Sequence, residues 1–395
     1  MKILVVSQYF YPENFRINQL CLDLKERGHK ITVLTGKPNY PKGEYFNGYS
    51  FKGDESEIWN DIPIIRVPLR ARKNGSINLI RNYLSFIYQG RKKICHIDDN
   101  FDLIYVFGVS PITVALPAIK LKKRKKIPII MNVQDLWPEN IVAITGMKNK
   151  IIIKAVDILV DYIYKNCDLI LTASPCFVNI IKERGIKTKI VYWPQYSIVE
   201  KCDEPLFVFD ENWFNIVFTG NIGEAQGIDI AIEAAKKLHD YPIHWHFIGD
   251  GRQRDFLEKK VKSFQLNDVI TFYGYIPEKE IPKYLSVADA ALLILKPDPV
   301  FDMTIPAKLQ TYLACGTPIL GCVSGESKRI ITEGNLGLVA EEVTIEALVN
   351  VCKDFYNLSK EKRELFKINA FNYGNTNFNK RSLLEKLEFY MEDMK

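Results

Sequence analysis

Short apolar runs alternate with helical segments along almost the whole chain, and this alternation restricts the possible folds more than any other feature. The first half has apolar runs at residues 3–7, 30–34, 64–68, 103–107, 127–133, 169–173 and 189–192. The second half has them at residues 214–219, 245–248, 269–273, 290–295 and 319–320. Strands that alternate with helices predict parallel sheets covered by helices. We therefore expect an α/β fold with two Rossmann-like domains that face each other across a cleft.

The alternation breaks once, near the middle of the 395-residue chain. Residues 197–210 contain Asp, Glu and Pro and show no strand or helix pattern. A chain of this length exceeds what one hydrophobic core usually supports, so we place the domain boundary there. The predicted domains are residues 1–200 and 201–376, and an amphipathic helix predicted at 377–395 packs back on the first domain.

Composition excludes several classes of protein. No apolar run reaches the ~18 residues that a membrane-spanning helix needs, and residues 1–7 indicate a strand rather than a signal peptide. We therefore expect a cytoplasmic location. The eight cysteines form no CxxC pair and the five histidines form no HExxH motif, so we expect reduced thiols and no metal site.

One segment of the second half has the pattern of a phosphate-binding turn. The apolar run 214–219 is followed by the glycine-rich sequence GNIGEAQG at 220–227 and then by a helical segment. A strand, a glycine turn and a helix allow backbone N–H groups to approach a diphosphate, so we expect the N–H groups of residues 220–223 to bind one. The absence of GxGxxG and of a Walker lysine disfavours a dinucleotide dehydrogenase and a P-loop NTPase.

A second segment, residues 306–321, points to the same chemistry. A short helix is predicted between Pro306 and Gly316, and Lys308 places a positive charge near its N-terminus, where N–H groups and the helix dipole favour an anion. An isolated PxK would indicate only a packing helix with a surface lysine. The glycine turn upstream favours a phosphate site. Its expected residues are Gly220, Asn221, Gly223, Gln226, Gly251, Arg252, Tyr275, Pro306, Ala307, Lys308 and Thr311.

Polar and aromatic residues follow two strands of the first half. Tyr11, Glu13, Asn14 and Arg16 follow the run 3–7, and Asp135, Trp137 and Glu139 follow the run 127–133. Ligands of open α/β sheets bind beyond the carboxyl ends of the strands, so these side chains suit a sugar or a nucleotide. Alternatively, Asp135 caps the next helix.

The net charge of +6 is concentrated in the first half. A basic run, KLKKRKK, begins at Lys120 and ends at Lys126, and the amphipathic segment 77–95 also carries basic residues. Such a surface attracts anionic lipid or nucleic acid. A solvated helix face for the first segment and a core-packing helix for the second fit the pattern as well.

The motifs together resemble those of one family. FTGNIGEAQG at 218–227, GDGR at 249–252 and the segment from PAK at 306–308 to YLACGTP at 312–318 resemble the family 4 glycosyltransferases of GT-B fold. SQYFYPENFR at 7–16 and QDLWPE at 134–139 are similar to the bacterial branch that transfers fucosamine-type amino sugars during surface-polysaccharide synthesis.

The resemblance implies an activity and its partners. A UDP-sugar would be held by the C-terminal domain, and a sugar such as FucNAc, an N-acetylated deoxyhexosamine, would pass with retention to a polyprenyl-linked saccharide in capsule or O-antigen synthesis. No metal or other cofactor is expected. Tyr11, Asn14, Arg16, Trp137 and Glu139 would face the acceptor. The lipid acceptor would bring the protein to the inner face of the cell membrane, through residues 120–126 and 77–95.

The chain departs from the family pattern at charged positions. Asn221 and Gln226 stand where many members carry Arg and Lys, and Met303 and Thr311 replace a pair of glutamates. We therefore expect other cations to stabilise the departing diphosphate. The expected catalytic residues are Lys308, Arg252, Asp135 and Glu13.

Two alternative functions are open at this point. A GT-B epimerase acting on a UDP-amino sugar would use Asp135 and Glu13 as an acid/base pair. A non-catalytic nucleic-acid-binding module depends on the basic run alone, without an RNA-reading motif, so we expect no nucleic-acid partner.

Overall fold

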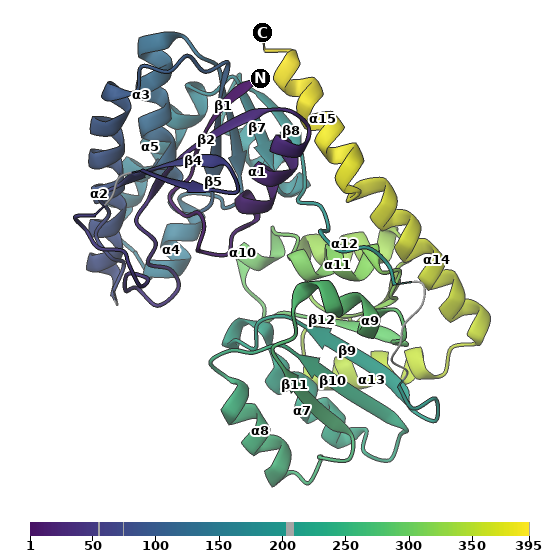
Figure 1. Cartoon of the computed structure of the whole chain (residues 1–395). Helices are drawn as coiled ribbons and strands as arrows, with labels where there is room; N and C mark the ends of the chain where they lie inside the picture. The colour runs from purple at the N-terminus through teal and green to yellow at the C-terminus, as the bar shows by residue number, and fades with distance from the viewer. Residues whose placement is uncertain (54–55, 74, 203–208, 395) are drawn as a thin grey trace. The chain divides into compact units, whose positions relative to one another are not determined.

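The computed structural model describes residues 1–53, 56–73, 75–202 and 209–394, which form two compact units (Figure 1). Unit 1 contains residues 1–193 and 384–395, and unit 2 contains residues 194–383. The predicted ranges were 1–200 and 201–376. The first division lies earlier because Val199 is already buried in a core cluster of unit 2, although residues 197–210 read as a linker in the sequence. Residues 203–208 of that predicted linker lie outside the described residues.

Unit 1 is built on an eight-stranded sheet in the order β3-β4-β2-β1-β5-β6-β7-β8. The strands are β1 (Lys2–Val6), β2 (Lys30–Gly36), β3 (Ser56–Trp59), β4 (Ile62–Val67), β5 (Leu103–Gly108), β6 (Ile129–Val133), β7 (Leu169–Thr172) and β8 (Lys189–Tyr192). β3 pairs antiparallel with β4, and the other neighbours pair in parallel. Every residue of β5, β6 and β7 is buried, as in a sheet with helices on both faces.

The helices of unit 1 connect these strands. They are α1 (Arg16–Glu26), α2 (Ser76–Lys93), α3 (Ala115–Lys125), α4 (Glu139–Thr145), α5 (Lys150–Lys165) and α6 (Pro175–Glu183), with the short 3-10 helices η1 (Ile94–His96) and η2 (Ile112–Val114). The C-terminal helix α15 (Lys380–Glu392) contributes its last part to this unit, where Glu388 pairs with Arg27 at 2.6 Å.

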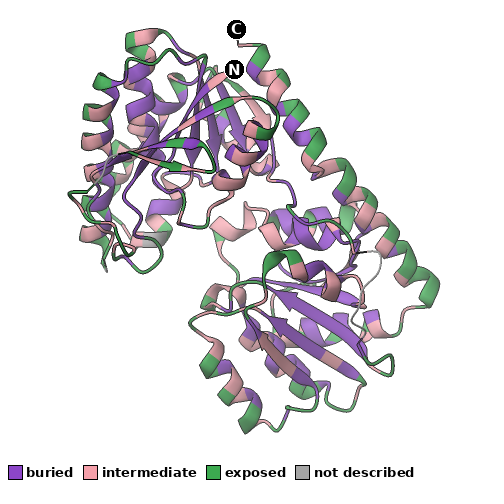
Figure 2. Cartoon of the chain, in the orientation of Figure 1, coloured by how far each residue is buried: buried purple, intermediate pink, exposed green. Residues whose placement is uncertain are grey.

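Unit 2 is built on a six-stranded parallel sheet in the order β11-β10-β9-β12-β13-β14. The strands are β9 (Phe214–Thr219), β10 (Ile243–Ile248), β11 (Ile270–Gly274), β12 (Ala290–Ile294), β13 (Ile319–Cys322) and β14 (Gly337–Val339). Along β9, Ile216 and Phe218 belong to one core cluster and Val217 to another, so the two faces of the sheet bury separate cores. Figure 2 shows β9 and β10 as mostly buried and β11 as mostly intermediate.

The helices of unit 2 cover this sheet. They are α7 (Ile228–Lys237), α8 (Arg254–Ser263), α9 (Ile281–Leu285), α10 (Pro299–Asp302), α11 (Ala307–Ala314), α12 (Gly325–Glu333), α13 (Ile345–Tyr356) and α14 (Lys360–Asn377), with η3 (Glu224–Gln226) and η4 (Glu278–Glu280). In each unit the parallel strands end at one edge of the sheet, and the loops after those ends carry most of the predicted site residues.

Candidate functional site

The turns after β9 and β10 pack directly against each other at the carboxyl edge of unit 2. The N–H of Gly220 donates to the carbonyl of Ile248 at 2.9 Å, and the N–H of Ile222 donates to the carbonyl of Asp250 at 2.8 Å. A Cβ atom at Gly249 would lie 1.8 Å from the carbonyl oxygen of Gly220, and the φ of Gly249 is +142°. Only glycine allows this approach of two backbones.

This packing corrects the expectation that all N–H groups of residues 220–223 face a ligand. The backbone bonds of the two turns use the N–H groups of Gly220 and Ile222. Within the part of the chain that the structure describes, the N–H groups of Asn221 and Gly223 have no recorded acceptor. The turn therefore offers two backbone donors rather than four.

Lys308 reaches the same turn from the N-terminal end of α11. Its Nζ donates to Oε1 of Gln226 and lies 4.0 Å from the centroid of the Phe218 ring. No carboxylate pairs with Lys308 among the residues that the structure describes, and burial lowers the pKa of Lys308 to about 7. The ring face and the amide oxygen favour the charged form, but an anion would favour it far more.

The other predicted residues of unit 2 fall into two groups. Gly251 belongs to the packed turns, because a Cβ there would lie 2.3 Å from the carbonyl oxygen of Ile222. Thr311 is buried and bonds to the carbonyl of Ala307 within α11. Arg252 and Tyr275 are exposed on the turns after β10 and β11, and neither forms a hydrogen bond or ring contact with Lys308.

A pocket of about 410 Å³ opens beside the glycine turn, between α7 and α8. Its lining includes Gly223, Asp229, Gln253, Phe256 and Lys296. Phe256 is 60% exposed, which is unusual for a phenylalanine on a helix. No sequence motif indicated Phe256 or Lys296, although Phe256 is an apolar residue in the mostly polar helix α8.

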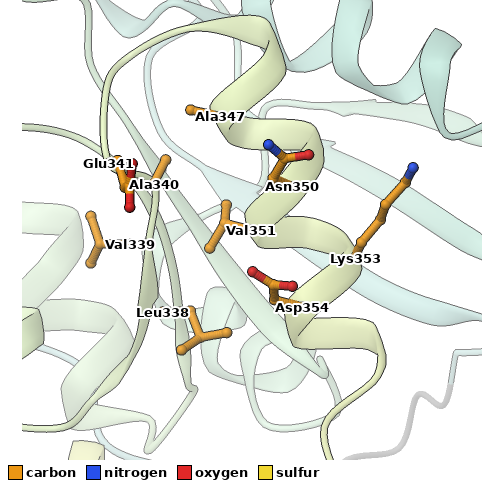
Figure 3. A pocket seen from close by; sticks show the side chains of 9 residues that line it. All are labelled: Leu338, Val339, Ala340, Glu341, Ala347, Asn350, Val351, Lys353 and Asp354. Carbon is orange, nitrogen blue, oxygen red and sulfur yellow. The ribbon is translucent and has the colours of Figure 1, made fainter.

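A larger pocket of about 560 Å³ lies between β14 and α13. Figure 3 shows Asn350, Lys353 and Asp354 of α13 on one side and Val339 and Glu341 on the other. Its lining contains none of the residues predicted from the sequence, so the two phosphate-type turns and this pocket are separate features.

In unit 1, Glu13 joins the loops that follow β1 and β2. Its carboxylate accepts hydrogen bonds from the N–H groups of Asn39 at 2.8 Å, Tyr40 at 2.7 Å and Phe10 at 3.3 Å. The side chain is 2% exposed, and burial raises the pKa of Glu13 to about 7 although the three bonds oppose this. Glu13 therefore holds the two loops together, and both of its carboxylate oxygens already accept hydrogen bonds from the backbone.

Asp135 has a separate set of partners. Its Oδ2 accepts from the N–H of Ser110 at 2.7 Å, and burial raises the pKa of Asp135. The alternative role of Asp135 as a helix cap is wrong, because α4 begins four residues later with Pro138 at the cap position. Asp135 instead joins the loops after β5 and β6, and no recorded contact links it to Glu13 as an acid/base pair.

Trp137 and Glu139 lie beside this loop junction. Trp137 is only 5% exposed and its Nε1 donates to the Ser110 hydroxyl at 3.1 Å, so its indole anchors the loop and does not offer a stacking face. Glu139 begins α4, and its Oε2 is buried without a hydrogen-bond partner among the described residues. This oxygen of Glu139 is an unused acceptor, but it is closed to solvent.

Aromatic rings surround the loop after β1. Tyr9 stacks on Phe15 with centroids 5.0 Å apart, and Tyr40 lies 5.3 Å from Phe15. Tyr11 is 38% exposed and stacks on Trp59 at 4.8 Å, whereas Asn14 is exposed and Arg16 starts α1. Tyr40 lies in the loop after β2 and Trp59 in β3, so the sequence did not show that these two rings pack against the loop after β1.

The described residues offer neither a metal cluster nor a membrane-spanning helix. The described residues contain no group of three or more His, Cys, Asp and Glu side chains that could hold a metal ion. None of the helices in the described ranges is long and apolar enough to cross a membrane.

Comparison with known proteins assigns the chain to a class of enzyme. Residues 15–195 match the model of Glycosyltransferase Family 4, and residues 206–373 match that of Glycosyl transferases group 1. The chain is 25% identical over 350 residues to the putative colanic acid biosynthesis glycosyl transferase WcaI of Escherichia coli (strain K12), covering 80% of this chain and 82% of WcaI.

Solved structures share the fold. Sucrose-phosphate synthase from Thermosynechococcus elongatus matches with a TM-score of 0.74 at 15% identity, over 99% of this chain and 98% of that one. Anabaena Alr3699/HepE in complex with UDP and glucose matches with a TM-score of 0.64 at 14% identity, over the full length of both chains. The chain is therefore a glycosyltransferase of the GT-B fold, whose N-terminal half matches the Glycosyltransferase Family 4 model and whose C-terminal half matches the group 1 model.

Proposed function

We propose that this glycosyltransferase moves a sugar from a UDP-sugar to a lipid-linked saccharide during surface-polysaccharide synthesis, with retention of configuration. The observation that carries the proposal is Lys308, a cation without a carboxylate partner among the described residues, held at the glycine turn beside the free N–H groups of Asn221 and Gly223. The UDP complex of HepE and the colanic acid role in the name of WcaI support it. An N-acetylated deoxyhexosamine such as FucNAc is the proposed sugar.

Catalysis in this proposal depends on stabilising the leaving group. As the bond from the sugar to UDP breaks, negative charge develops on the diphosphate. The Lys308 ammonium and the two N–H groups are fixed before the reaction, so little reorganisation is needed when that charge appears. We propose that Arg252 adds a second cation from the exposed turn after β10, and that the reaction uses no metal or other cofactor.

A panel of nucleotides tests the proposal. Calorimetry with UDP, with GDP as the matched control, should show binding of UDP that is at least tenfold tighter. Transfer or hydrolysis assays with UDP-FucNAc, UDP-GlcNAc and UDP-glucose should show turnover of at least one sugar, with UDP-FucNAc fastest. Failure of UDP to bind, together with no turnover of any UDP-sugar, would overturn the proposal.

We also propose that unit 1 attaches to the inner face of the cell membrane, where a polyprenyl-linked acceptor resides. On α2, Ile77 and Tyr88 are each 68% exposed and Leu84 is 58% exposed, and Figure 2 shows exposed positions along this helix. A groove of about 790 Å³ between α2 and α3 is lined by apolar and basic side chains. Its lining residues are Leu84, Ile87, Tyr88, Arg91, Lys92, Cys95, His96 and Lys120.

The basic run that begins at Lys120 is less available than its sequence indicates. Lys122 pairs with Asp168 at 2.6 Å, Lys123 donates to the Tyr162 hydroxyl, and Lys125 donates to two backbone carbonyls. The membrane contact is therefore proposed to centre on the groove, where Arg91 and Lys92 lie beside exposed apolar side chains. Lys120, which lines the same groove, donates to the carbonyl of Arg91 at 3.1 Å and keeps its positive charge.

A further inference from the structure

Arg72 occupies an unusual position at the carboxyl edge of unit 1, in the loop after β4. Arg27, Arg66 and Arg184 of the same unit each pair with a carboxylate at 2.6 Å. Arg72 is half-buried, and no carboxylate pairs with it among the residues that the structure describes. Its guanidinium carbon lies 5.6 Å from the centroid of the Tyr40 ring. A partly buried cation without a counter-charge is costly unless an anion binds there.

The surrounding loops hold Arg72 in place before any ligand arrives. The backbone N–H of Arg72 donates to Oδ1 of Asn39 at 2.8 Å. Asn39 is fully buried, and its own N–H donates to Glu13 at 2.8 Å. A chain of hydrogen bonds therefore runs from the loop after β1, through the loop after β2, to Arg72. Such preorganisation lowers the entropy cost of binding.

The charge of Arg72 also acts on neighbouring hydroxyl groups. Burial raises the pKa of Tyr83 to about 12, and the positive charge of Arg72 opposes that rise. Burial likewise raises the pKa of Tyr9 above its usual range, again with Arg72 in opposition. Two buried tyrosine hydroxyls therefore lie within the electric field of the Arg72 guanidinium.

The loop that carries Arg72 is tied to the helix proposed to contact the membrane. The N–H of Arg70 donates to the Ser85 hydroxyl at 3.0 Å, and Nδ2 of Asn82 donates to the carbonyl of Arg70 at 2.5 Å. Ser85 and Asn82 both belong to α2, which also carries the exposed Leu84 and Tyr88. A polyprenyl diphosphate keeps its phosphates at the membrane surface, and the loop that carries Arg72 is bonded to the helix proposed to contact that surface.

We propose that Arg72 binds the diphosphate group of the lipid-linked acceptor. The proposal rests on the proposed function, since it names the chemical group of that acceptor. A guanidinium can form two parallel hydrogen bonds to phosphate oxygens, which fixes the orientation of the group as well as its position. The ring of Tyr40, which is 37% exposed, then lies beside the diphosphate, where the first sugar of the acceptor can pack on it.

The test compares Arg72→Gln with Arg70→Gln, an exposed arginine two residues earlier in the same loop. Two acceptors are used with each protein, a saccharide on a short prenyl diphosphate and the same saccharide as an alkyl glycoside. Arg72→Gln should raise the KM of the diphosphate acceptor by about tenfold or more and leave the KM of the alkyl glycoside unchanged. Arg72→Lys should give an intermediate value, because it keeps the charge and loses the paired hydrogen bonds.

Calorimetry separates this proposal from the proposed function. The short prenyl diphosphate saccharide should bind the parent protein at least tenfold more tightly than Arg72→Gln, while both proteins bind UDP equally. An equal loss with both acceptors, or an effect of Arg70→Gln as large as that of Arg72→Gln, would overturn the proposal. Weakened UDP binding by Arg72→Gln would assign the arginine to the donor instead. Failure of the parent to bind UDP would count against the proposed function alone.

Discussion

The candidate sites at the carboxyl edges of the two sheets are built from different groups, backbone in unit 2 and side chains in unit 1. In unit 2 the site consists of backbone, because the turns at Gly220 and Gly249 touch and one lysine lies over them. In unit 1 it consists of side chains from the loops after β1, β2, β4, β5 and β6, held by the buried carboxylates of Glu13 and Asp135. A backbone site is suited to a phosphate common to many substrates, whereas a side-chain site can differ for each acceptor.

The two edges also differ in which group titrates near neutral pH. In unit 2 it is a base, because burial lowers the pKa of Lys308 to about 7. In unit 1 it is an acid, because burial raises the pKa of Glu13 to about 7. Lys308 lies where a ligand can restore its charge, but Glu13 is sealed by three backbone N–H groups. The first group is therefore expected to affect binding, and the second to affect stability.

The largest effect is expected from Gly249→Ala, which tests whether the site of unit 2 depends on backbone contact. A methyl group there would lie 1.8 Å from the Gly220 carbonyl, so the turns must separate at a cost of about 4 kcal/mol. UDP affinity and hydrogen exchange of the β9 and β10 segments should both change. Gly185→Ala is the control, because its φ is also positive at +70° but nothing lies within 4 Å, and about 1–2 kcal/mol is expected.

An unchanged UDP affinity in Gly249→Ala would show that the contact between the turns does not shape the ligand site.

Glu13→Gln tests the stabilising role assigned to unit 1. The folded-state pKa of about 7 lies above the ordinary value of 4.5, so the folded state binds the proton more tightly. This stabilisation is complete below pH 4.5 and is lost as the pH rises through 7, by about 3 kcal/mol in total. Glutamine keeps the neutral form at all pH values, so the variant should lack this loss.

Hydrogen exchange of the β1 and β2 segments of the whole protein measures the prediction, at about pH 5 and about pH 8. The exposed Glu26→Gln gives the background. If the free-energy difference between the parent and Glu13→Gln is the same at both pH values, Glu13 does not titrate in this range.

The sequence predicted the two edges unequally, for a physical reason. The residues of a backbone site are close in sequence, so a glycine turn and a PxK segment were enough to predict a candidate site in unit 2. Even there, the sequence did not show that the turns after β9 and β10 lie side by side. The N–H groups of Gly220 and Ile222 bond to the turn after β10 and are not available to a ligand. In unit 1, Tyr40 bonds to Glu13 directly, and Arg72 is linked to Glu13 through Asn39. These residues are far apart in sequence and meet only because β1, β2 and β4 lie near one another in the sheet.

Burial explains the remaining differences. Apolar alternation predicted the two α/β units, because it depends only on which faces are covered. It could not show that Trp137 would be used as an internal anchor, since an indole has the same appearance in a sequence whether it stacks on a sugar or donates to Ser110. Nor could a run of lysines show that Lys122 would pair with Asp168.

Lys308→Ala tests whether the charge of Lys308 contributes to UDP binding in unit 2. Loss of a charge-assisted hydrogen bond costs about 1.5–3 kcal/mol, so the dissociation constant of UDP should rise by about tenfold or more. The parent should take up a proton on binding UDP near pH 7 to 8, because the ligand restores the charge of Lys308. Calorimetry in buffers of different ionisation enthalpy measures both quantities.

Lys237→Ala, which removes a surface ion pair with Glu346, is the control for Lys308→Ala. Equal UDP affinity in the parent and in Lys308→Ala, or no proton uptake by the parent, would place the phosphate site elsewhere on this edge.

The smallest effects are expected at the proposed membrane groove of unit 1, where each residue contributes little and the sum matters. A basic residue near an anionic leaflet contributes about 1 kcal/mol, so Lys92→Gln and Lys120→Gln should each weaken binding to phosphatidylglycerol-containing vesicles by about fivefold. Tyr88→Ser should weaken binding also in high salt, because its contribution is apolar and is not screened.

Phe389→Ser is the matched control, since Phe389 is 63% exposed on α15 of the same unit. Co-sedimentation with and without phosphatidylglycerol gives the measurement. If Phe389→Ser weakens binding as much as Tyr88→Ser does, general surface hydrophobicity explains the attachment and the groove has no special role.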